Sequence, residues 1–250
     1  KLFKKKIIQK FERAHKDEIL IDINSPEAFE EFFWKKEANE NYIEKDLLLK
    51  NELSVSNIIE FKKYIKLILR RYNKNFYLSK NNNNILRIND LYNEINNSIF
   101  LIFFRDPINQ SVSLLNQHIN FSKIHKENKF ALKYMNYLGH YEFGKNSKRF
   151  DIGKYEKNDK YNINYWLEIW KNYYSYAINN LKKERIYFIC YEDLAKNPNE
   201  YLNSKINISE FKENINFNEF KNMNKIVKEN VDDKIKEEAY MIYSKLRGLN

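Results

Sequence analysis

Short apolar runs separate longer stretches of helical periodicity along this chain. The run from Ile99 to Phe104 is too short for a buried helix and is rich in Ile and Phe, so it predicts a strand buried on both faces. A second strand is predicted over Arg185 to Tyr191, and shorter ones over Ile19 to Ile23 and Phe76 to Leu78. Helices are expected in the stretches between these runs.

The expected helices follow the positions where apolar residues recur with helical spacing. The first helix begins at Asn24 to Pro26, and the second covers about Val55 to Arg71. The next two begin at Asn84 and at Pro107. The last three cover Tyr161 to Lys182, Glu192 to near Pro198, and about Asp232 to Leu246. Repetition of helix, strand and helix indicates parallel strands joined by right-handed crossovers. We therefore expect a helix-rich α/β fold. No internal repeat or sharp change of composition marks a second domain, so residues 1–250 form one domain in this interpretation.

Composition narrows the function classes only slightly. The formal net charge of +10 favours a polyanion or an anionic small molecule as partner, but a solvated basic surface explains it equally well. The single cysteine, Cys190, lies in an apolar run and is expected to pack as a small hydrophobic residue. No apolar run has the length of a membrane span, and we expect a cytoplasmic protein. Because the chain starts at Lys1 without an initiator Met, we expect it to be an N-terminally truncated fragment.

The residues after the Ile99 to Phe104 run change abruptly from apolar to polar. Arg105 and Asp106 follow the predicted strand, and Pro107 suits the first position of a helix, where its missing N–H costs nothing. A strand, a tight turn and a helix N-terminus bring backbone N–H groups and the positive end of a helix dipole to the carboxyl end of the strand. Together with the charge of Arg105, this arrangement predicts an anion-binding site.

Lys80 has a comparable place in the sequence. It lies between the short apolar run at Phe76 to Leu78 and a helix that Asn84 can cap. This position puts a second cation between a strand end and a helix start. It also fits a loop lysine in an Asn-rich turn, and the sequence alone leaves both interpretations open.

One stretch has the spacing of a phosphate-binding P-loop. Gly139, Gly144 and Lys145 give the pattern G-x-x-x-x-G-K. However, Asn146 stands where a P-loop has the Ser or Thr that holds magnesium, the intervening residues are bulky, and the preceding segment has a helical pattern. We therefore interpret the match as coincidental.

Several motifs, in order, resemble those of sulfotransferases that use 3′-phosphoadenosine 5′-phosphosulfate (PAPS). They are RDPINQSVS, YLSKNNNN and YEDLAKNP, while SPEAFEEFFW, SKNNNNILRI and GHYEFG are especially similar to a bacterial branch of that superfamily. The resemblance covers most of the chain. It implies a three-layer fold with a central parallel β-sheet flanked by helices, as in P-loop NTPases.

The resemblance also implies roles for individual residues. Arg105 and Ser113 match the residues that bind the 3′-phosphate of the donor, and Lys80 matches the lysine near the transferred sulfuryl group. Tyr191 matches a strand end near the adenine, although a core tyrosine fits its sequence context as well. PAPS is then the co-substrate, the acceptor is an unidentified hydroxyl or amine, and in-line transfer of the sulfuryl group needs no metal.

The catalytic base is not identified by any motif. In the cytosolic branch a histidine lies two residues after the lysine, but here that position is Asn82, which cannot accept a proton. The candidates are His118, Glu31 and His140. Each has a structural alternative. His118 fits a helix residue that faces the core or solvent, Glu31 fits a carboxylate stabilising the first turn of a helix, and His140 fits a bond to a backbone carbonyl.

The beginning of the chain departs from the family pattern. Nothing before Glu27 matches the Gly-, Ser- and Thr-containing loop that grips the 5′-phosphosulfate. If the loop is absent from the protein, a degenerate or binding-only protein is the alternative. Two other classes also stay open. A nucleotide-dependent phosphotransferase needs a true P-loop with magnesium ligands, and a nucleic-acid-binding protein needs clustered Lys and Arg with exposed aromatic residues. Neither pattern is evident, so no nucleic-acid partner is expected.

Overall fold

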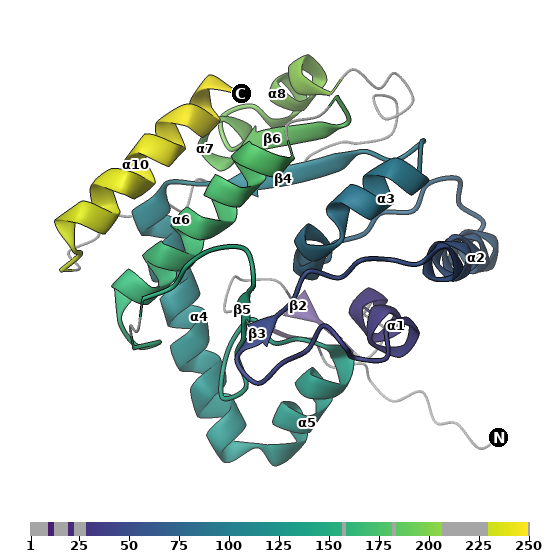
Figure 1. The fold of residues 1–250 in the computed structure, drawn as a ribbon, viewed down its shortest axis with the longest axis horizontal. Coiled ribbons are helices and arrows are strands. Elements are labelled where there is room, and N and C mark those ends of the chain that lie inside the picture. The colour runs from purple at the N-terminus through teal and green to yellow at the C-terminus, as the bar shows by residue number, and fades with distance from the viewer. Residues whose placement is uncertain are drawn as a thin grey trace.

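The computed structural model describes residues 10–12, 20–22, 29–156, 159–181, 184–206 and 230–249. Within these ranges the elements, in chain order, are β1 (Phe11–Glu12), β2 (Leu20–Ile21), α1 (Glu30–Glu37), β3 (Leu47–Leu48), α2 (Val55–Tyr72), the 3-10 helix η1 (Asn82–Leu86), α3 (Ile88–Glu94), β4 (Phe100–Phe104), α4 (Pro107–Glu127), α5 (Lys129–Leu138), β5 (Arg149–Phe150), α6 (Ile163–Asn180), β6 (Ile186–Cys190), α7 (Tyr191–Leu194), α8 (Pro198–Lys205) and α10 (Asp233–Gly248). Figure 1 shows this helix-rich arrangement.

The two longest strands, β4 and β6, confirm the strands predicted from the two main apolar runs. β4 and β6 pair in parallel, with Phe100 opposite Ile186 and Phe104 opposite Cys190. In the described part of the chain the sheets are small. β4 pairs with β6, β3 pairs in parallel with β5, and β1 pairs with β2 in antiparallel orientation. The protein is therefore a helix-rich α/β structure with small parallel sheets.

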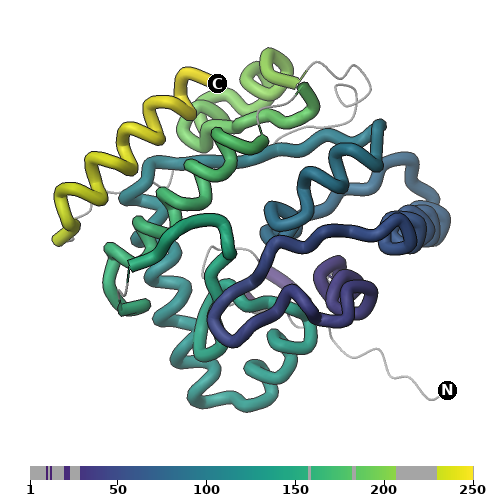
Figure 2. The backbone as a smooth tube through the Cα atoms, in the orientation of Figure 1, coloured from purple at the N-terminus to yellow at the C-terminus, as the bar shows by residue number. Residues whose placement is uncertain are grey.

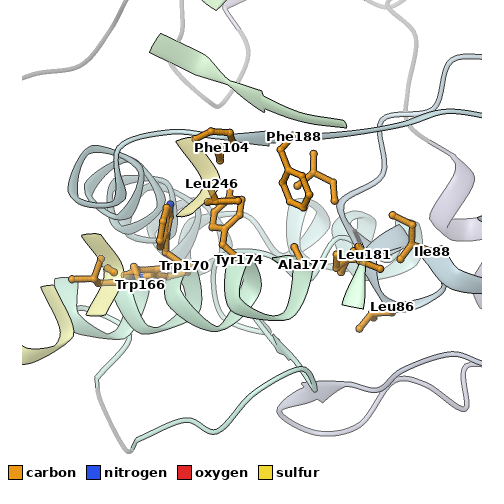
Figure 3. Close-up of a cluster of buried hydrophobic side chains, with 14 of the residues drawn as sticks. Leu86, Ile88, Phe104, Trp166, Trp170, Tyr174, Ala177, Leu181, Phe188 and Leu246 are labelled. Atoms are coloured by element: carbon orange, nitrogen blue, oxygen red, sulfur yellow. The ribbon is translucent and has the colours of Figure 1, made fainter. Parts of the chain in front are cut away.

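The α6 helix covers one face of the β4–β6 pair. Its apolar side carries Trp170, Tyr174 and Ala177, all at most 3% exposed. Figure 3 shows Phe104 and Phe188 projecting from the strands toward this helix. These side chains are core because their spacing puts them on one stripe that faces the sheet.

The helices α4 and α10 also pack against α6 and complete the main core. Figure 2 shows α10, in yellow, along the outer side of α6, while α1 and α2 lie on the opposite side of the molecule. The α1–α3 region has a second apolar cluster around Trp34, Ile58, Phe61 and Leu91. Phe100 of β4 contacts both clusters and joins them.

The predicted strand at Phe76 to Leu78 is wrong. These residues have no regular structure: Tyr77 is anchored by its hydroxyl to Glu30 on α1, while Phe76 and Leu78 are 52% and 87% exposed. The helix predicted from Asn84 is also shifted. Asn81 caps η1 instead, by accepting a hydrogen bond from the backbone N–H of Asn83 at 3.0 Å, and α3 follows from Ile88.

Two further boundaries differ from the sequence prediction. The helix expected to run from Glu192 to near Pro198 is two short helices, because Pro198 opens α8 rather than closing α7. The predicted start at Asn24 to Pro26 lies outside the described residues, which resume at Phe29 just before α1.

Candidate functional site

Arg105 and Tyr191 lie next to each other at the carboxyl ends of two neighbouring strands. Arg105 follows β4 and Tyr191 follows β6, and the parallel register sets Phe104 beside Cys190. The Arg105 guanidinium lies over the Tyr191 ring, 4.8 Å from its centroid. This cation–π contact holds the charged group against the ring at the carboxyl ends of the two strands.

Carboxylates occupy the start of α4. Asp106 accepts a hydrogen bond from the backbone N–H of Asn109 at 2.8 Å, and the backbone N–H of Asp106 itself donates to Glu192 at 2.8 Å. Tyr240 of α10 donates to the second oxygen of Asp106 at 3.0 Å. The sequence predicted backbone N–H groups available to an anion at this helix start. The structure corrects that prediction, because Asp106 and Glu192 already satisfy two of these donors.

Ser113, the other residue matched to the 3′-phosphate, lies in the second turn of α4. It is exposed on α4, seven residues after Asp106 and four after Asn109, which puts all three on the same side of the helix. The strand-end group of this protein consists of Arg105 and Tyr191, and the carboxylates of Asp106 and Glu192 lie at the adjoining start of α4.

Glu31 belongs to a second, buried group. Its carboxylate meets the Arg87 guanidinium through two bonds of 2.9 and 3.0 Å, and it also accepts hydrogen bonds from Asn81 at 2.8 Å and from the Tyr42 hydroxyl. Burial raises the pKa of Glu31, but the charge and hydrogen bonds of Arg87, with those of Tyr42 and Asn81, hold it below its ordinary value. A carboxylate that is 2% exposed and has these four bonds is a poor proton acceptor for a substrate.

The neighbouring Glu30 has a similar environment. It accepts hydrogen bonds from Tyr77 at 2.7 Å, Asn84 at 2.7 Å and Trp34 at 3.3 Å. Both glutamates of α1 therefore bind the polar residues on either side of Lys80 and η1. The effect is to hold this Asn-rich segment in one place, although it has no strand of its own.

Lys80 lies at an exposed edge of that segment, next to a group from a distant part of the chain. Asn82 donates to Glu142 at 3.4 Å, and His140 Nδ1 lies 3.8 Å from the other Glu142 oxygen. Burial raises the pKa of Glu142, but the hydrogen bond and charge of His140 and the charge of Lys80 hold it below its ordinary value. The structure thus brings together Lys80, Asn82, His140 and Glu142, which we call the Lys80 group.

Sequence reasoning singled out Lys80 and His140 but missed Glu142. Glu142 lies two residues after His140, in the H-Y-E stretch that follows α5. Nothing in the sequence around Glu142 indicates that it contacts Asn82, which lies 60 positions earlier.

His118 is placed in the core rather than in either group. It is 2% exposed, and its Nδ1 accepts a hydrogen bond of 3.3 Å from the backbone N–H of Gly144. Its ring packs against that of Trp166, with 5.3 Å between the ring centroids. Burial, followed by the charge of Lys160, lowers the pKa of His118 to about 4. These contacts give His118 a structural role in holding the segment around Gly144 against α4.

The P-loop-like segment follows helix α5, as its pattern predicted. Gly139 ends that helix in the left-handed conformation, with φ +80°. Gly144 has φ +79°, and a Cβ there would lie 2.3 Å from His125 Nδ1. The two glycines therefore allow close packing against histidine and glutamate side chains, and the interpretation of the match as coincidental is confirmed.

No family model, curated protein or solved structure matches this chain. None of the helices in the described ranges combines the length and apolar character needed to cross a membrane. The same ranges contain no group of three or more His, Cys, Asp or Glu side chains arranged to hold a metal ion.

Proposed function

We propose that this protein is a sulfotransferase that moves the sulfuryl group of PAPS to a hydroxyl or amine acceptor, on the three-layer α/β fold of that superfamily. The observation that carries the proposal is the contact between Arg105 and Tyr191 at the adjacent carboxyl ends of β4 and β6. Open α/β folds bind nucleotides at this end of their strands. A guanidinium held beside an aromatic ring offers hydrogen-bond donors for a phosphate and an aromatic surface for a nucleotide base.

The donor is held by the strand-end group in this proposal. The in-plane N–H groups of Arg105 bind the 3′-phosphate as a fork, and the hydroxyl of the exposed Ser113 donates to the same phosphate. Tyr191 holds the guanidinium through their cation–π contact and lies near the adenine in this proposal. Because Asp106 and Glu192 occupy the start of α4, the selectivity for the phosphate comes from side chains rather than from the helix terminus.

Lys80 acts on the reacting sulfuryl group. During transfer the bond between sulfur and the bridging oxygen of the 5′-phosphate breaks, a bond forms between sulfur and the acceptor oxygen, and the acceptor loses its proton. The Lys80 ammonium stabilises the charge that develops on the bridging oxygen. Its place supports this role, since Glu30 and Glu31 hold the segment around it while the lysine itself stays exposed.

Titration calorimetry of the full-length protein with 3′-phosphoadenosine 5′-phosphate tests the donor site. The control ligand is 5′-AMP, which lacks the 3′-phosphate. Arg105→Ala is compared with Arg70→Ala, which removes the same charge from an exposed position on α2. We expect binding that requires the 3′-phosphate and weakens by about 10- to 100-fold in Arg105→Ala only. Equal binding of the two nucleotides, or no binding by the wild type, overturns the proposal.

A further inference from the structure

The outward side of α2 carries closely spaced cations. Lys62, Lys66 and Arg70 recur every four residues, which puts their exposed side chains in one row along the helix. Lys63 is exposed beside that row, and Glu60 pairs with it at 2.7 Å. The row itself therefore consists of like charges at the spacing at which helix side chains interact most directly.

This distribution of charge is unfavourable for an isolated helix. Like charges four residues apart repel, whereas solvated helices gain support from pairs of opposite sign at that spacing. The helix dipole favours cations only in the last turn, which accounts for Arg70 and Arg71 but not for Lys62 or Lys66. The sequence has no Asp or Glu at positions 61–89 that could balance them. A negatively charged partner would relieve this repulsion.

Aliphatic side chains lie among these cations. Ile59 and Leu67 are 48% and 67% exposed. Ile59 precedes Lys66 by seven residues and Arg70 by eleven, close to two and three whole turns, so it lies in the same row. Leu67 is four residues after Lys63 and adjoins it. We call this surface the α2 basic face, and it consists of Ile59, Lys62, Lys63, Lys66, Leu67 and Arg70.

The opposite side of α2 is fixed to the rest of the protein. Ile58 and Phe61 are buried in the cluster with Trp34, and the Phe61 and Trp34 ring centroids are 4.5 Å apart. Near the start of the helix, the Asn57 side chain donates to the carbonyl of Glu37 on α1 at 3.1 Å. Because the helix is already formed and anchored, binding through its outer face does not require a segment to be ordered first.

The kind of apolar residue on each side of α2 distinguishes between anionic partners. Proteins bind single-stranded nucleic acids through aromatic side chains that stack on the bases. The aromatic residues within α2 face inward instead, and the Tyr64 ring lies 5.0 Å from that of Phe33. Tyr72, exposed at the end of the helix, suits either partner because tyrosine is also common at membrane interfaces. Aliphatic residues among lysines and arginines favour an anionic lipid surface.

We propose that the α2 basic face docks this protein on an anionic membrane surface. The helix lies along the surface, the ammonium and guanidinium groups contact lipid phosphates and carboxylates, and Ile59 and Leu67 enter the boundary between headgroups and acyl chains. Figure 2 shows α2 at the edge of the molecule, on the side away from α10, where a flat surface can approach it. This inference does not depend on the proposed sulfotransferase activity.

Sedimentation of the whole chain with vesicles tests the role of charge. Vesicles of equal parts phosphatidylserine and phosphatidylcholine are compared with vesicles of phosphatidylcholine alone. We expect binding to the first kind only, and weaker binding as the salt concentration rises. Combining Lys62→Gln with Lys66→Gln should weaken it by about 10- to 30-fold, at about fivefold for each lost charge. The matched control combines Lys236→Gln with Lys245→Gln, at exposed positions on α10, and should bind like the wild type.

Substitutions of Leu67 test insertion of the aliphatic side chains. We expect Leu67→Gln to weaken vesicle binding by about tenfold, whereas Met241→Gln, at a 59% exposed position on α10, leaves it unchanged. Leu67→Trp provides a direct readout, because the three tryptophans of the chain are at most 3% exposed. Phosphatidylserine vesicles should shift the emission of the introduced indole to shorter wavelength, and lipids with brominated acyl chains should quench it.

Several outcomes would overturn the proposal. Equal binding to both kinds of vesicle, or to neither, excludes an anionic membrane as the partner, and this comparison needs no variant. An introduced indole at position 67 that brominated lipids do not quench excludes insertion. The chain is also mixed with a single-stranded RNA oligonucleotide. RNA binding that is lost when Lys62 and Lys66 are both replaced, without vesicle binding, assigns the α2 basic face to a nucleic acid instead.

Discussion

Arg87 and Glu31 form a two-bond ion pair, at 2.9 and 3.0 Å, whose side chains are 0% and 3% exposed. Arg87 also lies over the Trp34 ring, 5.0 Å from its centroid. The pair joins α1 to the end of η1 and so supports the segment that carries Lys80. Because both charged groups are buried away from water, removing either one leaves the other as an uncompensated buried charge.

Removing one member of this pair should be far more costly than removing both. We expect Arg87→Met to lower the free energy of unfolding by about 3–5 kcal/mol, since the Glu31 charge stays buried without its partner. The double variant Arg87→Met with Glu31→Leu should lose less than the single one. Urea denaturation measures both, with the exposed Arg70→Met as control. A single variant within about 1 kcal/mol of the wild type would contradict the assignment of a buried ion pair.

Stability should fall in acid because of His118. Its pKa is lowered from 6.5 to about 4 in the folded protein, so the unfolded chain binds the proton more readily. The stabilisation from neutral His118 is complete above about pH 6.5 and is lost as the pH falls toward 4, by at most about 3 kcal/mol. His118→Asn keeps an acceptor for the Gly144 N–H without titrating, and should flatten the pH dependence over that window. Urea denaturation at a series of pH values checks this, and an unaltered slope in the variant would count against it.

Gly144 should not tolerate a side chain. Its φ of +79° is unfavourable for alanine, and the added Cβ would lie 2.3 Å from the buried His125 ring. We expect Gly144→Ala to destabilise the protein by more than about 1–2 kcal/mol, the usual cost of the left-handed conformation alone. Gly248→Ala is the matched control, since nothing lies within 4 Å of a Cβ there. Thermal melting of both variants distinguishes them, and equal melting temperatures would refute the prediction.

Lys80→Ala should affect turnover and not donor binding. The proposed role is to stabilise charge that develops only during transfer, so we expect kcat with PAPS to fall by about 100- to 1,000-fold. The affinity for 3′-phosphoadenosine 5′-phosphate should stay within about twofold, since that ligand carries no sulfuryl group. Lys74→Ala, at an exposed position, is the control. A loss of nucleotide affinity that matches the loss of kcat would show that Lys80 binds the ground state instead.

The sequence by itself determined the local elements that carry the strand-end group. The apolar runs specified β4 and β6, Pro107 specified the start of α4, and the alternation of helices and strands implied the parallel pairing that sets Arg105 beside Tyr191. These features follow from periodicity and from the backbone restrictions of proline. Both act over a few residues and are therefore visible in one sequence.

Only the tertiary structure decided the partners of the polar residues. Phe76 to Leu78 has an apolar, strand-like pattern, yet the hydrogen bond from Tyr77 to Glu30 fixes it without a neighbouring strand. Glu31 resembles an ordinary first-turn glutamate until Arg87, 56 positions later, reaches it. Glu142, which pairs with His140, meets Asn82 in the same way. Long-range contacts depend on how the helices pack, and that packing leaves no local pattern in the residues that it brings together.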